Sequence, residues 1–267
     1  MGIKEKNQEK LLRMLNSHGS LSIAAIEKAL RLSAASVRRY LADMERAGQL
    51  HRYHGGARAA VEKGGGSYQF YEASSSFTAE KHLIGRMAAE LITDHDRLFF
   101  DSGTTVLECG NVLAEILSSG MLKDLRIVTN SLAFASGLIP LCPVMLTGGM
   151  IRHSRMDLCG SAALENVRHY NFTKAILGTD AISNTGELST TDEDTAALAA
   201  AVWERSDEVF ILADSSKLGK SSFVPYGTLS NSRTTLITDH LADAKVLEEL
   251  RQLGGRVIIA SPANDMK

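Results

Sequence analysis

The chain has 267 residues, of which 44% are hydrophobic and 22% charged, and its formal net charge is −2. This composition predicts a soluble globular protein with one large domain or two unequal domains. Cys109, Cys142 and Cys159 have no Cys-x-x-Cys spacing, which argues against a disulfide framework or a zinc site and favours a reducing cytosol. The polar segment 1–10 predicts no signal peptide, and the most apolar stretch, 196–203, is too short to span a bilayer.

Charge is distributed unevenly along the chain. Residues 1–58 contain 11 Lys and Arg against 5 Asp and Glu, whereas the remainder contains 18 against 26. A basic first fifth joined to an acidic body indicates that the first part binds a polyanion. A solvated basic face without a partner would have the same charge, so charge alone leaves that alternative open.

Three short helices are predicted in the basic segment, over residues 7–17, 22–30 and 34–47. Ser22 and Ser33 stand where the N-caps of the second and third helices are expected. An apolar stripe with i, i+4, i+7 spacing buries one side of the third helix: Val37, Leu41 and Met44. A tight turn between the second and third helices predicts a helix-turn-helix.

The third helix presents polar residues on the side away from its apolar stripe, and such a helix reads base edges from its first turns. The basic, glycine-turned segment 49–58 fits the wing of a winged helix, which follows the phosphate backbone. The predicted DNA-binding residues are Ser33, Ser36, Arg38, Arg39, Tyr40, Arg52 and His54. For His54, a structural or solvent-facing role agrees with the sequence as well as a phosphate contact does.

Two adjoining motifs resemble the N-terminal signature of the DeoR family of bacterial transcriptional regulators. They are Leu-Ser-Ala-Ala-Ser-Val-Arg-Arg-Tyr-Leu at 32–41 and His-Gly-Gly-Ala at 54–57. The family pattern is Val-Ser-x-x-Thr-Ile-Arg-Arg-Asp-Leu, followed by His-Gly-Gly-Ala. Tyr40 departs from this pattern, because the family usually has Asp there, and its role is therefore open.

The sequence predicts a winged helix-turn-helix domain over 1–58, a linker over 59–76 and an α/β domain for effector binding and oligomerisation over 77–267. The linker is rich in Gly and Ser and has no sustained period. After a helix predicted over 78–92, apolar runs recur, most of them separated by helical stretches, at 97–100, 125–128, 144–146, 175–177, 209–212, 235–237 and 257–259. This alternation predicts a doubly wound, mostly parallel α/β sheet.

Small, polar or charged residues follow six of these predicted strands. In open α/β sheets ligands bind outside the carboxyl ends of the strands, so we expect the six clusters to line one crevice. The predicted effector-binding residues are Asp101, Ser102, Gly103, Thr104, Thr105, Asn130, Gly148, Gly149, Asp180, Asp214 and Lys217.

The segment 101–105 is the centre of this prediction. It joins the strand at 97–100 to a helix predicted over 106–117, so free backbone amides and the positive end of a helix dipole coincide there. Phosphate binds at such places. An ordinary strand-to-helix turn that needs a glycine and two polar residues is the alternative for this segment taken alone.

The second part of the chain is similar to the C-terminal sensor domain of the DeoR family, whose fold is related to ribose-5-phosphate isomerase and glucosamine-6-phosphate deaminase. The matching segments are 80–81, 101–105, 128–131, 147–149, 174–180, 213–217 and 237–239. Thr195 and Ala199 stand where the family commonly carries a Glu and, four residues on, a Lys. The departure implies different polar contacts in the effector pocket or the loss of an ion pair between subunits.

These features predict a DNA-binding repressor of a carbohydrate-utilisation operon that is relieved by a phosphorylated sugar. Asp101, Asp180 and Asp214 would accept hydrogen bonds from sugar hydroxyls, and Lys217 would neutralise the phosphate or contact a carbonyl or hydroxyl. We expect the protein to bind double-stranded DNA and to form a homo-oligomer. We expect it to bind no membrane, cofactor or metal. Its expected location is the cytoplasm, on the nucleoid when it is bound to its operator.

Two other functions are open at this point. A sugar-phosphate isomerase or deaminase needs a general base and an acid, which Asp101, Asp180 and Lys217 would have to supply, because the strand-end clusters contain no His or Glu. The attached DNA-binding segment favours sensing over turnover, since kinship in fold does not carry function with it. An architectural DNA-binding protein would use the second domain only to oligomerise, with 196–202 as an interface helix.

Overall fold

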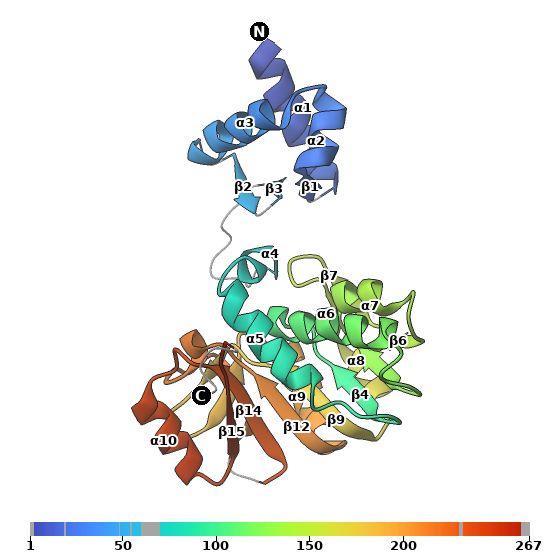
Figure 1. Cartoon of the computed structure of the whole chain (residues 1–267), viewed down its shortest axis with the longest axis vertical. Helices are drawn as coiled ribbons and strands as arrows, with labels where there is room; N and C mark the ends of the chain where they lie inside the picture. The colour runs from blue at the N-terminus through green and yellow to red at the C-terminus, as the bar shows by residue number, and fades with distance from the viewer. Residues whose placement is uncertain are drawn as a thin grey trace. The chain divides into compact units, whose positions relative to one another are not determined.

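Figure 1 shows the computed structural model of the chain, which describes residues 3–18, 20–47, 49–53, 55–59, 70–229 and 232–262. The chain forms two compact units, Met1–Ser67 and Tyr68–Lys267, and the division falls within the linker predicted at 59–76. That prediction needs a correction, because the helix α4 (Phe70–Ser74) occupies part of the segment. Phe70 is buried in the second unit, so this part of the chain is folded. The boundaries at 58 and 77 otherwise stay predictions.

The first unit combines three helices with a small antiparallel sheet. Its elements are α1 (Ile3–His18), β1 (Ser20–Ser22), α2 (Ile23–Leu30), α3 (Ala34–Arg46), β2 (Leu50–Tyr53) and β3 (Gly56–Ala59). The strands lie in the order β1-β3-β2, with Leu50 opposite Ala59 and Ser22 opposite Gly56. The β2-β3 hairpin is the predicted wing, and β1, which was not predicted, pairs with its other edge.

Local chemistry sets the ends of α2 and α3 as predicted. Ser22 Oγ accepts a hydrogen bond from the backbone N–H of Ala25 at 3.1 Å, and Ser33 Oγ accepts one from Ser36 at 3.4 Å. Between them, Arg31 ends α2 in the left-handed conformation, with φ 54°. The core beneath this turn is drawn from all three helices and the wing: Leu11, Leu15, Ile26, Leu30, Val37, Leu41, Met44, Leu50 and Ala57.

The second unit is built on a seven-stranded sheet in which all neighbouring strands are parallel. Its strands are β4 (Arg97–Phe100), β5 (Arg126–Thr129), β6 (Val144–Leu146), β9 (Phe172–Gly178), β12 (Ser206–Leu212), β14 (Thr234–Asp239) and β15 (Arg256–Ala260). Their order across the sheet is β15-β14-β12-β9-β4-β5-β6. The order therefore reverses between β4 and β9, which confirms the doubly wound prediction.

Helices cover both faces of this sheet (Figure 1). One face carries α5 (Thr78–Ala89), α6 (Thr104–Ser118) and α7 (Leu132–Leu138), and the other carries α8 (Ser161–Val167), α9 (Glu193–Glu204) and α10 (Ala244–Gln252). Alternate residues of each strand supply the two cores, since side chains along a strand point to opposite faces. On β4, Phe99 packs on the α9 side, whereas Leu98 and Phe100 pack on the α5 side.

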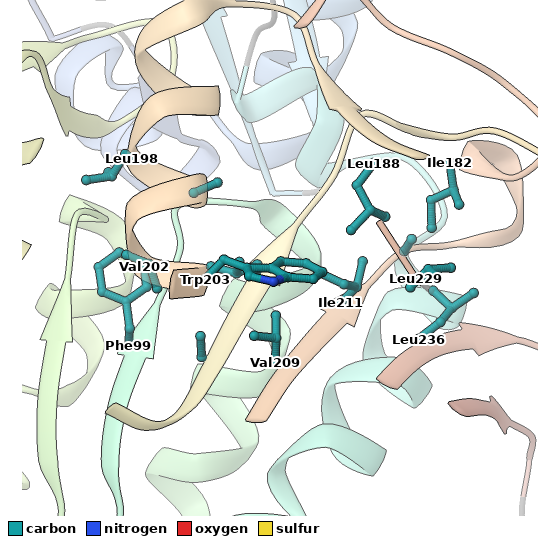
Figure 2. Packing of buried hydrophobic residues seen from close by; sticks show 14 of the residues in the cluster. Phe99, Ile182, Leu188, Leu198, Val202, Trp203, Val209, Ile211, Leu229 and Leu236 are labelled. Atoms are coloured by element: carbon teal, nitrogen blue, oxygen red, sulfur yellow. The ribbon is translucent and has the colours of Figure 1, made fainter. Parts of the chain in front are cut away.

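Trp203, the only tryptophan of the chain, lies in the core on the α9 side. Figure 2 shows its ring beside Val209 and Ile211. A Cβ on Gly227 would lie 3.0 Å from ring carbon Cζ3, so a side chain there would crowd the indole.

Five short strands of the second unit were not predicted from the sequence. β10 (Ala181–Ile182), β11 (Glu187–Thr190) and β13 (Val224–Thr228) form a small antiparallel sheet, and β7 (Met150–Arg152) pairs with β8 (Asp157–Cys159). Each lies outside the parallel sheet. Two of these pieces, the β7-β8 hairpin and β11, contribute to the site described below.

The apolar stretch considered as an interface helix lies in α9. Its residues Ala196, Leu198, Ala201 and Val202 are buried within the second unit itself, so that interpretation is wrong and the stretch belongs to the core. Within the described ranges, each helix is too short or too polar to cross a lipid bilayer.

Gly85 sets the distance between α5 and α6. A Cβ added there would lie 2.6 Å from the backbone nitrogen of Cys109. Because these backbone atoms cannot move aside without shifting α6, we expect Gly85→Ala to lower the free energy of unfolding by about 1–3 kcal/mol. Gly137→Ala in α7 is the control, since a Cβ there meets nothing within 4 Å, and it should stabilise by up to ~1 kcal/mol. Urea unfolding followed by Trp203 fluorescence measures both; equal stabilities would contradict the close packing.

Candidate functional site

A cavity of about 340 Å³ opens where the strand order reverses. Its wall comes from the carboxyl ends of β4, β9 and β12, the turn before α5, the β7-β8 hairpin and the first turn of α9. In doubly wound sheets this crevice is the usual ligand site. The fold therefore makes this cavity the candidate effector site.

The structure brings together eight of the eleven predicted effector-binding residues in this wall. They are Asp101, Ser102, Gly103, Thr104, Thr105, Asp180, Asp214 and Lys217. They follow β4, β9 and β12, three strands that are neighbours in the sheet although their ends lie far apart in the sequence. That they bind an effector stays a prediction.

Asn130, Gly148 and Gly149 do not lie among the described lining residues, which corrects their assignment to this cavity. The reason is topological, because they follow β5 and β6, which lie on the far side of β4 from the reversal. Asn130 is buried, and Gly149 turns with φ 104° so close to Cys159 that a Cβ would lie 2.4 Å from its carbonyl oxygen. Gly148 and Gly149, both with positive φ, turn the chain after the edge strand β6.

The N-terminus of α6 opens into the cavity without a side-chain cap. Its N-cap residue is Gly103, and no side-chain hydrogen bond closes this end, whereas Ser33 and Asp192 cap α3 and α9. Thr104 and Thr105 are buried around it. The first backbone N–H groups of a helix and the positive end of its dipole together form a site for an anion.

Three carboxylates line the cavity, and each is oriented by hydrogen bonds. Asp101 Oδ2 accepts from the backbone N–H of Gly178 at 3.2 Å, and Asp180 Oδ2 accepts from that of Thr191 at 3.0 Å. Asp214 Oδ1 accepts from the backbone N–H two residues on, at 3.1 Å. A carboxylate has acceptor capacity beyond such bonds, which suits sugar hydroxyls. Among the described residues, no cluster of three or more His, Cys, Asp and Glu could hold a metal ion.

Lys81 and Arg155 were not predicted as site residues from the sequence, although both line the cavity with Lys217. Lys81 comes from α5, before the first parallel strand, and Arg155 comes from the β7-β8 turn, so neither follows a strand of the main sheet. The available signal for Arg155 was the density of charge at 152–157 between apolar segments. The cavity thus sets three cations against its three carboxylates.

Behind the cavity wall, Arg152 joins two carboxylates from separate elements. Its Nε and Nη2 donate to the two oxygens of buried Asp157 at 2.9 and 2.7 Å, and its Nη1 donates to Asp192 at 2.7 Å. Ser102 Oγ donates to Asp157 at 3.2 Å, and Arg155 Nη1 lies 3.2 Å from Asp192 Oδ2. Bidentate pairs are stiff, so this network holds the segment 101–105, the β7-β8 hairpin and α9 together.

Thr195 and Ala199, the two departures from the family pattern, have different environments. Thr195 lines the cavity, accepts a hydrogen bond from Arg152 Nη2 at 2.9 Å and donates to Asp192 at 2.8 Å. Ala199 is buried in the core. A neutral hydroxyl therefore stands in the wall where the resemblance leads us to expect a Glu, and Asp192 supplies the carboxylate beside it.

Withdrawal from water raises the pKa of Asp101, and the Asp157 carboxylate adds to the rise, against the hydrogen bonds from the backbone of Ser102 and Gly178. Because the folded pKa exceeds the unfolded value of about 3.9, ionisation of Asp101 costs stability as pH rises through the folded pKa. We expect Asp101→Asn to raise the melting temperature at neutral pH. The gain should vanish as pH falls below about 4.

Asp96→Asn is the control of opposite sign. Burial opposes ionisation of Asp96, but hydrogen bonds from Lys174, Thr93 and Thr173 prevail and lower its pKa. Its carboxylate therefore stabilises the fold above the unfolded pKa, so Asp96→Asn should lower the melting temperature at neutral pH and lose this effect in acid. Melting curves from pH 3 to 8 compare both variants with wild type; a parallel response of the two would contradict the assignment.

In the first unit, Arg38 and Arg39 are exposed on α3, and Ser36 and Tyr40 are half-buried beside them. Ser33 is exposed but serves as the N-cap, so its hydroxyl has a structural role whatever else it contacts.

Arg52 Nε lies 2.8 Å from Glu45 Oε2, and this ion pair connects the wing to α3. His54 lies outside the described residues.

A winged helix-turn-helix joined to a doubly wound domain with an anion-compatible crevice is the plan of a ligand-responsive transcription regulator. The family models described as DeoR-like helix-turn-helix domain and DeoR C terminal sensor domain match residues 8–63 and 76–240. The chain belongs to the DeoR family of transcriptional regulators.

Similar proteins cover almost the whole chain. The HTH-type transcriptional regulator GlpR of Haloferax volcanii is 30% identical over 254 residues, which are 95% of this chain and 96% of that protein. The lactose phosphotransferase system repressor of Staphylococcus aureus is 31% identical over 252 residues, or 91% and 95% of the two chains. Among solved structures, ribose 5-phosphate isomerase from Plasmodium falciparum aligns with 51% of this chain over 51% of its own length, at 20% identity and a TM-score of 0.39. A likeness of this degree supports no conclusion about ligand or activity.

Proposed function

We propose that the protein represses genes of carbohydrate use and that a phosphorylated sugar bound in the cavity relieves this repression. The observation that carries the proposal is the uncapped N-terminus of α6, which opens into a cavity holding both cations and carboxylates. The amides and the hydroxyls of Thr104 and Thr105 suit a phosphoryl group. Asp101, Asp180 and Asp214 suit the hydroxyls of the sugar.

The size and charge of the cavity narrow the ligand class. Its volume of about 340 Å³ lies at the small end of ligand pockets, which span roughly 300–1,000 Å³, and so suits a single phosphorylated sugar. Lys217 and Arg155 would balance the phosphoryl charge. The similar protein from Staphylococcus aureus is a lactose phosphotransferase system repressor, which agrees with this ligand class.

The DNA-binding part of the proposal rests on α3. Arg38 and Arg39 would contact base edges or phosphates of a double-stranded operator, with Arg52 and the wing along the backbone. We further propose a cytoplasmic homo-oligomer. Large apolar side chains exposed on β6 and β7 support self-association: Met145, Leu146, Met150 and Ile151. Light scattering of the full chain tests the oligomer directly.

A thermal-shift panel tests the effector. Sugar phosphates, polyol phosphates and the same sugars without phosphate would be compared at equal concentration. We expect one or more phosphorylated sugars to stabilise the second unit, by about 2.7 kcal/mol at a hundredfold excess over Kd, and the unphosphorylated sugars to have no effect. Equal shifts by both forms would contradict the phosphate site.

Enzymatic turnover of a sugar phosphate is the alternative function for this cavity. The raised pKa of Asp101 suits a general base. The described lining residues, however, include no Glu and no His, so a second acid–base group would have to be another Asp or a Lys. We therefore expect no isomerised or deaminated product when the chain is incubated with the sugar phosphates that stabilise it. Product formation in proportion to protein would favour the enzyme.

A further inference from the structure

One edge of the parallel sheet is open. β6 is the last strand in the order across the sheet, and among the described strands only β5 pairs with it (Figure 1). The backbone N–H of Thr147 donates to the carbonyl oxygen of Thr129, at the end of β5, at 3.0 Å. Because backbone groups along a strand point alternately to its two edges, those of Val144 and Leu146 point away from β5. They are therefore directed toward any strand that lies alongside β6.

The side chains at this edge are apolar. Ten large apolar side chains are exposed in the described part of the chain, and four of them lie in β6 and in the turn that leads to it: Ile139, Leu141, Met145 and Leu146. Exposed apolar surface that is concentrated in one place marks a surface for interaction. The open backbone and the apolar side chains thus coincide on β6.

The edge also lacks charge. Although 22% of the chain is charged, residues 127–151 contain no Lys, Arg, Asp, Glu or His. Charged side chains are one of the usual means by which edge strands are kept from pairing, and β6 has none on either side of it in sequence. A surface without charge meets its own copy without repulsion. Charge complementarity therefore favours a second copy of this chain over a charged partner.

The alternation of backbone groups determines how two such edges pair. A contact between identical surfaces has a two-fold axis, so the two strands run antiparallel. When the pairing is centred on Met145, Val144 of one copy lies opposite Leu146 of the partner subunit, and each of these pairs exchanges two hydrogen bonds. Met145 then faces Met145 of the partner subunit as a non-hydrogen-bonded pair, with Cα atoms about 4.5 Å apart.

A groove at one end of this edge gains a cover from the same pairing. It has a volume of about 720 Å³ and lies at the amino ends of β4, β5, β6 and β9, where Val144, Met145 and Tyr170 are part of its lining. Antiparallel pairing places the carboxyl end of each β6, where Leu146 is exposed, beside the amino end of the other. Apolar surface of each copy then covers apolar surface of the other.

We propose that two copies of the chain pair antiparallel along β6, centred on Met145, and so form one sheet that continues through both subunits. The inference rests on the homo-oligomer of the proposed function and assigns the surface through which it forms. It is independent of the effector and of its cavity, because β6 lies on the far side of β4 from the point where the strand order reverses.

Single cysteines test the pairing and its register in the full chain. Cys142→Ser serves as the background, because Cys142 is half-buried near β6. With oxidised glutathione, Met145→Cys should form a disulfide between copies, since its Cα separation lies within the roughly 4.4–6.8 Å that a disulfide spans. Leu146→Cys should not, because Leu146 faces Val144 of the partner subunit. A disulfide in Leu146→Cys without one in Met145→Cys, or none in either variant, would overturn the proposal.

Met145→Asp tests the interface without a cross-link. Two carboxylates would face each other across the axis, so the variant should have half the mass of the wild-type oligomer in light scattering and associate at least about tenfold more weakly. Met121→Asp is the matched control, because Met121 is 68% exposed outside this edge, and it should keep the wild-type mass. Thermal melting checks that both variants fold; if Met145→Asp does not, the cysteine variants decide.

The outcomes separate this inference from the proposed function. If the wild-type chain is an oligomer and a folded Met145→Asp variant keeps its mass, the interface lies elsewhere and only the inference fails. If the wild-type chain is a monomer at every concentration, the inference and the proposed homo-oligomer fail together. The proposed effector would still be tested by the thermal-shift panel.

Discussion

Arg38→Ala should weaken binding to a duplex selected by the full chain from a random DNA library by about 1–3 kcal/mol. This is the usual cost of losing an Arg that contacts a guanine edge. Arg38 is exposed on α3, opposite the stripe that packs into the core, so its removal should not unfold the unit. If Arg39 contacts a phosphate instead, Arg39→Ala should weaken binding to all sequences alike and reduce the salt slope by about one.

Arg46→Ala is the matched control for both substitutions. Arg46 lies at the other end of α3, is paired with Asp43 at 2.7 Å and is well exposed, so the variant loses the same charge from the same helix. Fluorescence anisotropy over a range of salt concentrations measures all three variants. If Arg38→Ala and Arg46→Ala lose the same affinity, the basic face acts only through its net charge and the contact assigned to Arg38 is wrong.

Thr104→Val should leave DNA binding intact and strongly weaken the release of DNA by the sugar phosphate. Valine matches threonine in shape, so the variant removes one buried hydroxyl from the uncapped N-terminus of α6. The loss of a hydrogen bond to a charged group costs about 1.5–3 kcal/mol, which is roughly 10- to 150-fold in effector affinity. Release of DNA should therefore need a correspondingly higher concentration of the sugar phosphate.

Thr228→Val controls for the same chemical change elsewhere. Thr228 is exposed at the end of β13 and does not line the cavity. Both variants would be titrated with sugar phosphate while bound to the selected duplex. A Thr104→Val variant that releases DNA at the wild-type concentration would contradict a phosphate site at α6.

The parallel sheet was predictable from the sequence because buried parallel strands are continuous apolar runs. β4 and β6 begin and end at the predicted residues, and the caps at Ser22 and Ser33 follow from side-chain chemistry alone. The place of residues 101–105 in the cavity wall was predictable from local sequence as well. They join such a strand to a helix that no side chain caps.

The remainder of the site depends on contacts between distant segments. Arg152 and Asp192 pair across 40 residues of sequence, and Lys81 enters the wall from a helix that precedes the sheet. None of these three residues follows a strand of the parallel sheet, so a search of the strand ends does not find them. Asn130 was assigned to the cavity because it is a polar residue that follows a parallel strand. The sequence does not show whether such a strand lies next to the point where the strand order reverses, and β5 does not.

The central claim is that ligand binding in the cavity opposes DNA binding by the first unit. Linkage requires that a sugar phosphate which weakens DNA affinity by some factor must itself bind the DNA-bound chain more weakly by the same factor. Calorimetric titration of the stabilising sugar phosphate into the free chain and into the chain saturated with its selected duplex measures this factor. We expect at least about fivefold weaker binding to the DNA-bound chain, the lower end of allosteric coupling. Equal affinities for the two forms would contradict the account.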